Sequence, residues 1–200
     1  MLVVMLGFTF FSASMYAGAN LGTGLRTPQF LLAVLAGNLL LGIYTGLLAY
    51  IAAHTGLSTH LLARRAFGQQ GAILPSVLLG VTQVGWFGVG VAMFALPVAQ
   101  LFPHFPRVLL LLVSGACMSL TAYYGIKSLT IHSIIAVPAI VLLGCGSMAK
   151  AFHDFGGLSA WFAMEPSAPI PLASAIGICV GSFISGGTLT PDFTRYARTP

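Results

Sequence analysis

Charge is what this sequence lacks most. Only 6% of its 200 residues are charged, with 3 acidic side chains against 8 basic ones. A soluble domain carries about 25% charged residues, because water must wet its surface. Hydrophobic residues instead make up 58% of the chain, the mean hydropathy is +0.97, and apolar runs of about 20 residues, long enough to cross a bilayer, recur along it. The composition excludes a soluble globular protein and predicts an all-α polytopic membrane protein.

Cysteine is also scarce. Cys117, Cys145 and Cys179 each lie singly inside an apolar run. An odd number without paired spacing argues against both a disulfide framework and a metal cluster, and favours small packing residues. The net charge of +5 falls in short connections, where basic residues set membrane topology. We therefore expect a lipid bilayer around the chain and no nucleic-acid partner.

The middles of the expected membrane spans contain no Asp, Glu, Lys or Arg. Proton relays normally use such residues, so the chain offers no obvious proton carrier. An anionic substrate would need a cation in its pocket, and none is available, so we expect a neutral one. No span holds together the nucleophile, base and orienting acid that hydrolytic chemistry needs. These absences argue against an enzyme, and the sequence predicts no cofactor.

The first apolar run does not begin like a signal peptide, which needs a positive region that this sequence does not have. The chain starts inside an apolar stretch, and its last residues, 198–200, show no terminal character. We therefore expect a fragment of a longer protein.

Six apolar spans are expected, at about residues 2–19, 30–53, 73–102, 108–126, 131–148 and from 172 onward. The connection at residues 54–71 carries paired arginines, which mark a cytoplasmic loop, and Ser58 or Thr59 can cap a short interfacial helix there. With this loop inside, five basic residues lie inside and three outside. The N-terminal side is then cytoplasmic.

The first span is interrupted at residues 7–14 by small and hydroxyl residues, and a related pattern returns at residues 181–188. Aromatic, apolar, Ser and small residues follow one another in Phe10-Phe11-Ser12-Ala13 and in Phe183-Ile184-Ser185-Gly186. Paired interrupted spans indicate a binding site at the bilayer midplane. We expect both spans to be discontinuous. In the sixth, residues 185–188 would be unwound, Pro191 would open the second half, and Asp192 would cap or charge its first turn.

Two other spans carry polar residues on one face. Asn38, Gly42 and Gly46 recur every four residues in the second span, which predicts a close helix contact with Asn38 bonded across it. Gln83 and Trp86 share a face of the third span. A buried glutamine needs a partner, which can be another helix or a ligand. Stacking on Trp86 and Phe183, with edge bonds to Gln83, would suit a flat heterocycle.

Three stretches resemble the nucleobase–cation symport family, in its purine and cytosine permease group. They are residues 5–15, 82–95, which hold the Gln–Trp run, and 181–190; residues 59–64 match as well. The resemblance extends over the whole chain. It implies five-plus-five inverted repeats (a LeuT-like fold), with the first repeat at residues 1–150 and the connection and sixth helix at residues 151–200. The remaining ion and substrate ligands would lie beyond residue 200.

The same resemblance implies sodium-coupled import of cytosine by alternating access, in a monomer of the bacterial inner membrane. Substrate would be bound by Gln83, Trp86, Phe183, Ser182, Ser185, Gly186 and Phe11, and sodium by the carbonyls of Gly7 and Phe10. A related base, hydantoin or allantoin remains an alternative substrate. A channel or structural membrane subunit is the alternative from another class.

Overall fold

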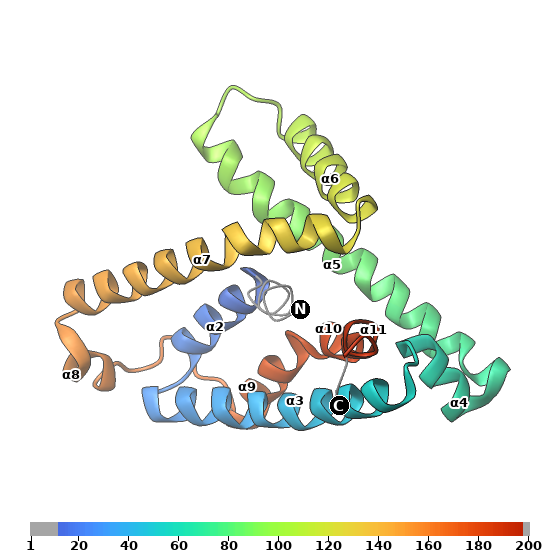
Figure 1. The fold of residues 1–200 in the computed structure, drawn as a ribbon. Helices are drawn as coiled ribbons and strands as arrows, with labels where there is room; N and C mark the ends of the chain where they lie inside the picture. Colours follow the sequence, from blue (N-terminus) through green and yellow to red (C-terminus); the bar gives the residue numbers. More distant parts are fainter. Residues whose placement is uncertain (1–11, 198–200) are drawn as a thin grey trace. The chain divides into compact units, whose positions relative to one another are not determined.

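The computed structural model describes residues 12–197, and the regular elements within them are all helices (Figure 1). These residues divide into two compact units. The first holds residues 12–19 and 87–166, and the second holds residues 20–86 and 167–197. The predicted all-α fold is confirmed. Each unit is described below by itself.

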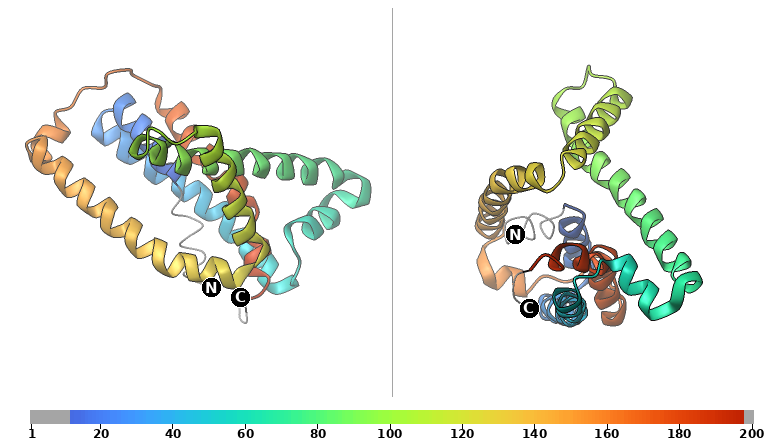
Figure 2. Two further views of the ribbon diagram at one scale, coloured as in Figure 1. Left: turned by 90° about the horizontal axis from the view of Figure 1, so that it is seen from above. Right: turned by 45° about the vertical axis from the view of Figure 1, so that its right-hand side comes forward.

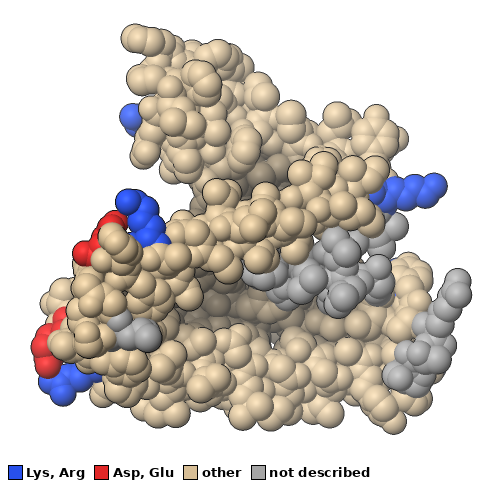
Figure 3. Space-filling model, turned by 60° about the vertical axis from the view of Figure 1, so that its left-hand side comes forward, with Lys and Arg blue, Asp and Glu red and all other residues tan. Residues whose placement is uncertain are grey.

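The helices follow the expected apolar spans. They are α2 (Ser12–Gly24), α3 (Thr27–Thr55), α4 (Thr59–Gly71), α5 (Ile73–Leu101), α6 (Arg107–Tyr123), α7 (Ile126–Asp154), α8 (Gly157–Phe162), α9 (Leu172–Gly181), α10 (Ile184–Thr188) and α11 (Thr190–Thr194). Among the described residues, α3, α5 and α7 are long and apolar enough to cross a membrane, while α6 and α9 are shorter apolar helices. Charged side chains form only a few small groups on the face drawn in Figure 3.

Two helix starts lie where the sequence predicts them, at Ile73 and at Leu172, which follows a proline. The first connection is much shorter than expected. Residues 20–28 were predicted to be a loop, but α2 continues to Gly24 and α3 begins at Thr27. The reason is packing, since Leu21 and Leu25 are 1% and 4% exposed and belong to a core cluster with Ala33 and Ala175.

Helix α3 is the centre of the second unit. The run α9, α10 and α11 packs along it, as Figure 1 shows. The approach is closest at Gly37, where an added Cβ would lie 2.5 Å from Cys179 Cβ. Because real Cβ atoms do not come that close, only glycine allows these two helices this separation.

The contact face predicted for α3 is wrong by one residue. The amide of Asn38 donates to the carbonyl of Val34 in its own helix, at 2.8 Å, and no atom of the described residues lies within 4 Å of the Cβ positions of Gly42 or Gly46. The buried residues on α3 instead include Ala33, Gly37 and Leu41. These are four apart and therefore share the face that meets α9.

Helix α4 links α3 to α5 (Figure 2). Ser58 is its N-cap, as predicted, and accepts a bond from the amide of Leu61 at 3.4 Å. The helix is broken near its end at Gly68, which has φ 74° and ψ 177°. Only glycine adopts that region of backbone space readily.

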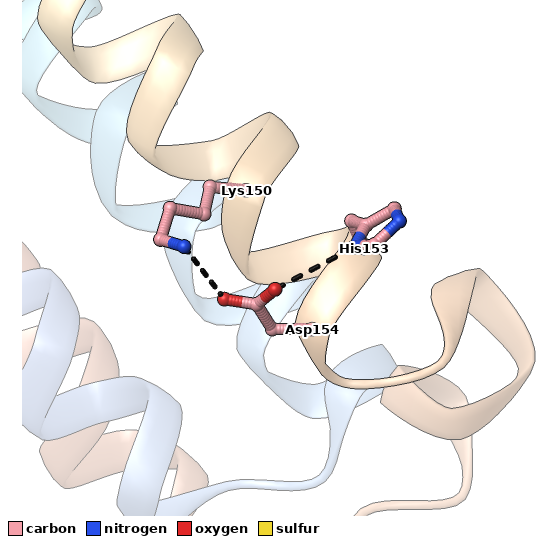
Figure 4. Close-up of polar contacts among 3 residues, drawn as sticks. All are labelled: Lys150, His153 and Asp154. Atoms are coloured by element: carbon pink, nitrogen blue, oxygen red, sulfur yellow. Dashed lines mark hydrogen bonds and ion pairs between the residues drawn. The ribbon is translucent and has the colours of Figure 1, made fainter.

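The first unit contains α6, α7 and α8. α7 packs against α6 and α8, and it runs unbroken through Pro138. Its last turn is polar. Asp154 Oδ2 forms an ion pair with Lys150 Nζ at 3.3 Å, and Asp154 Oδ1 lies 3.5 Å from His153 Nδ1 (Figure 4). This turn extends α7 beyond residue 148, where the apolar span was expected to end.

Candidate binding site

Gln83 and Trp86 lie one turn apart on α5, in the half of that helix that belongs to the second unit. Both are half-buried, whereas Thr82, Val84 and Gly85 around them are exposed. The two side chains therefore occupy a partly covered face, as their spacing predicts. The interpretation of that face as a binding surface depends on what Gln83 contacts.

The amide nitrogen of Gln83 is buried and has no hydrogen-bond partner among the described residues. A buried donor without a partner costs about 1–3 kcal/mol, and such groups are rare in native proteins. The sequence left two partners open for Gln83, another helix or a ligand. Among the described residues, this nitrogen makes no hydrogen bond to another helix. A ligand that offers an acceptor would satisfy it.

The sixth span is discontinuous, as predicted, but its break lies elsewhere. α9 ends at Gly181, and Phe183 has the non-helical angles φ −135° and ψ −6°. Residues 185–188, which were expected to be unwound, lie within the helical turn α10, and the chain bends again at Leu189 before α11. The predicted start of the second half at Pro191 is confirmed, because Pro191 stands in the first turn of α11.

The small residues of α10 allow close packing. Gly186 and Gly187 are buried, and a Cβ on Gly187 would lie 2.8 Å from the Thr45 methyl group on α3. The turn itself closes through a 2.7 Å bond from the amide of Gly187 to the carbonyl of Phe183. This explains why the predicted patch is helical: its glycines face a neighbour instead of releasing backbone groups.

Ser182, Phe183, Ser185 and Gly186 come together at this break. The Ser182 hydroxyl donates to the Cys179 carbonyl at 2.8 Å, so its donor is used within α9 and its lone pairs remain as acceptors. Ser182, Phe183 and Ser185 are half-buried and Gly186 is buried. The break thus offers one aromatic face with hydroxyl acceptors beside it.

Below the break, a polar junction fastens α11 and α10 to α3 and α4. Asp192, expected to cap or charge the first turn of its own half-helix, accepts a hydrogen bond from the backbone amide of Thr59 at 3.0 Å. The Thr59 hydroxyl donates to the Thr188 carbonyl at 3.2 Å, and the hydroxyls of Thr188 and Tyr44 are 3.0 Å apart. The contact joins residues 133 positions apart, so no local pattern could have predicted it.

A cavity of about 870 Å³ lies in the second unit between α3, α4, the start of α5 and the α10–α11 junction. Its lining is mainly apolar, with Thr82 and Thr188 among the polar exceptions. In the described part of the chain, the lining residues do not include Gln83, Trp86 or Phe183. The lining does include Thr82, which precedes Gln83 on α5, and Thr188, which ends α10.

The first interrupted segment contains three of the predicted site residues. Gly7, Phe10 and Phe11 lie outside the described residues. Among the residues that the structure describes, no group of three or more His, Cys, Asp or Glu side chains is placed to bind a metal ion. The sodium ligands proposed from the resemblance are backbone carbonyls of Gly7 and Phe10, so they stay a prediction.

Comparison with known proteins places these features in a family. All of residues 1–200 match the family described as permease for cytosine/purines, uracil, thiamine, allantoin. The cytosine permease of Escherichia coli strain K12 is 58% identical over 195 residues, which cover 98% of this chain and 46% of that protein. The hydantoin permease of Microbacterium maritypicum is 24% identical over 178 residues, 84% of this chain and 36% of that protein. The chain thus spans about half the length of the curated relatives it matches.

A solved structure has the same fold. It is a nucleobase-cation-symport-1 family transporter in a closed conformation with bromovinylhydantoin bound, and it superimposes with a TM-score of 0.84. The match covers 96% of this chain and 44% of that one, at 22% identity. At this identity the likeness shows the fold alone, which is that of a LeuT-like transporter.

Proposed function

The chain belongs to the family of permeases for cytosine/purines, uracil, thiamine and allantoin, and we propose that the whole protein imports cytosine by sodium-coupled symport with alternating access. Family membership supports a nucleobase transporter of the membrane rather than an enzyme. The proposal adds the substrate, the coupling ion and the residues that bind them. The buried, unpartnered amide nitrogen of Gln83, on the face shared with Trp86, is the observation that carries it.

The chemistry of these residues suits a neutral, flat base. Cytosine has a carbonyl oxygen and a ring nitrogen that accept hydrogen bonds, and either would satisfy the Gln83 amide donor. Trp86 and Phe183 supply aromatic faces for stacking. Ser182, Ser185 and Gly186 lie at the break in the sixth span, and the resemblance implies that Phe11 would border the pocket from the first. Cytosine is favoured over hydantoin because the relative named for cytosine is 58% identical and the one named for hydantoin 24%.

Sodium is proposed as the coupling ion because the spans carry no central acidic or basic residue. Proton-coupled transport normally relies on such residues, whereas sodium needs only oxygen ligands, which the carbonyls of Gly7 and Phe10 would supply. No other cofactor is proposed. We further propose a monomer in the bacterial inner membrane, with residues 1–150 as the first repeat, residues 151–200 beginning the second, and the N-terminal side in the cytoplasm.

Uptake of radiolabelled cytosine tests the proposal in cells that lack their own cytosine transport. Cells expressing the full-length protein should accumulate the label, and replacing external sodium with choline should abolish uptake. Gln83→Ala and Trp86→Ala should each lower uptake about tenfold or more, because a buried acceptor of the base left unsatisfied costs about 1–3 kcal/mol and stacking of a base on an aromatic ring is worth about 1–3 kcal/mol.

Two matched controls separate binding from folding. Asn38→Ala removes an amide that is already bonded within its own helix, and Phe87→Ala removes an aromatic ring next to Trp86 that is 45% exposed. Both should transport normally. Normal transport by the Gln83 and Trp86 variants would contradict the site, and stronger competition by hydantoin or allantoin than by cytosine would favour the alternative substrates. Passive, sodium-independent flux would favour a channel, and absence of flux would favour a structural subunit.

A further inference from the structure

The N-terminus of α4 is held from two sides. Within the chain, Ser58 caps it. From 133 positions away, the Asp192 carboxylate accepts the bond of the Thr59 amide. A carboxylate at a helix N-terminus is stabilised both by the hydrogen bond that it accepts and by the positive end of the helix dipole. Thr59 is 9% exposed, so water competes weakly for this contact.

The same junction includes two more hydrogen bonds, both at Thr188. Its carbonyl accepts from the Thr59 hydroxyl, and its hydroxyl is bonded to Tyr44 on α3. α10 and α11 also pack directly on α3, and α4 is separated from α3 only by residues 56–58. The start of α4, the two half-helices and α3 therefore form a closed set of contacts. Separating α4 from α11 would break several of them at once, including the charged one.

The other end of α4 is attached more weakly. Gly68 interrupts the helix with φ 74° and ψ 177°, and within the part of the chain that the structure describes no atom lies within 4 Å of a Cβ position there. Among the described residues, an exposed hydrogen bond between His60 Nδ1, in the first turn of α4, and Ser76 Oγ, at 3.0 Å, joins α4 to α5. A change of angle at Gly68 thus disturbs fewer interactions than a separation at Asp192.

We propose that residues 59–67 of α4 and the half-helices α10 and α11 move as one body during transport, with Asp192 as the positioning residue that couples them and Gly68 as the joint toward α5. The inference rests on the proposed transport function. It assigns a role to a carboxylate that does not contact the base: Asp192 transmits the movement of the broken helix to the loop on the side expected to be cytoplasmic.

Asp192→Ala, in the full-length protein, should lower the maximal rate of cytosine uptake about fivefold or more, as loss of a coupling of 1–3 kcal/mol implies, and leave KM within about twofold. Asp192→Asn keeps an acceptor oxygen and should recover most of the rate. Asp154→Ala is the matched control, because that carboxylate is an exposed partner of Lys150. A rise in KM alone would overturn the positioning role.

A crosslink distinguishes coupling from simple stabilisation. Thr59→Cys with Asp192→Cys, in a background without native cysteines, replaces the hydrogen bond by a disulfide on oxidation. Oxidised protein should transport faster than the same protein after reduction, because the tie is restored. Loss of uptake on oxidation, regained on reduction, would show that the junction must open and would overturn the proposal. Failure of the pair to crosslink in membranes would contradict the contact itself.

Spin-label distances test the inference without relying on cytosine uptake. Labels at Arg64 on α4 and Tyr196 just after α11 should give one narrow distance with and without sodium and base. Labels at Arg64 and Val77, on opposite sides of Gly68, should give a broader or ligand-dependent distribution. A broad first pair with a narrow second pair would overturn the inference, whereas failure of wild-type cytosine uptake would overturn the proposed function alone.

Discussion

Helix α7 and the run α9–α11 are both apolar segments of membrane length, yet they fold differently. α7 contains Pro138 and remains one helix of 29 residues. The run from Leu172 to Thr194 breaks at Phe183 and again at Leu189, although no proline occurs in it before Pro191. Local helix breakers therefore do not decide which of these two segments is discontinuous.

Tertiary contacts account for the difference. Most side chains of α7 are exposed, and its polar end is satisfied by an ion pair of its own. The α9–α11 run buries Ala175, Gly186, Gly187, Thr190 and Pro191 within the second unit. Its irregular geometry is stabilised by contacts with α3 and α4. We conclude that the broken helix depends on its neighbours, which the following substitutions test.

The largest expected effect comes from Gly37→Ala. The new Cβ would fall 2.5 Å from Cys179 Cβ, so α3 and α9 must move apart, at a cost of about 1–3 kcal/mol or more. The melting temperature of the purified full-length protein in detergent should drop by several degrees. Gly42→Ala is the matched control, since no described atom lies within 4 Å of that Cβ position, and it should not lower the melting temperature.

A second substitution tests whether Cys179 is the obstacle. Gly37→Ala combined with Cys179→Gly removes the atom that the new methyl group meets, and should recover much of the lost stability. If the single variant melts at the wild-type temperature, the close packing of α3 on α9 is incorrect.

A smaller effect is expected from Gly187→Ala. Here the obstacle is the methyl group of Thr45, 2.8 Å from the new Cβ, and a side-chain methyl can move more easily than a backbone. We expect a loss of about 1–2 kcal/mol, measured as a lower melting temperature and slower uptake. Thr45→Ser removes that methyl group, retains the hydroxyl, and should restore both. Equal damage from Gly181→Ala, which meets no atom, would refute the packing explanation.

The smallest effect is expected at the end of α7. Asp154→Asn removes an ion pair whose side chains are 79% and 51% exposed. Exposed pairs contribute about 0–1 kcal/mol and are screened by salt. The melting temperature should change by less than with either glycine substitution, and high salt should abolish the difference. A larger change would mean that the end of α7 is packed against other residues.

Helix boundaries set by local chemistry could be predicted from the sequence. Ile73 and Leu172 begin helices as expected, Ser58 caps α4, and Pro191 opens α11. In each case the deciding residues are adjacent in sequence: an apolar run, a preceding proline or a capping hydroxyl. That Gln83 and Trp86 share one face could also be predicted from the sequence, because helical spacing alone determines it.

Features that depend on distant neighbours could not be predicted in this way. Gly186 and Gly187 were expected to unwind the chain, but both are buried in the helical turn α10, and Gly187 packs against Thr45. The contact face of α3 contains Gly37 and not Gly42, because Cys179 lies opposite the former. Sequence periodicity predicts that α3 has a contact face. Which residue lies opposite it, here Cys179, is determined by the tertiary fold.

Binding of radiolabelled cytosine to the purified full-length protein, in saturating sodium, tests the central claim most directly. The claim is that the buried Gln83 amide, which has no partner among the described residues, bonds the base. Gln83→Ala should weaken binding about tenfold or more, as loss of a buried hydrogen bond implies, while Asn38→Ala binds like the wild type. Equal affinities in all three proteins would contradict the account.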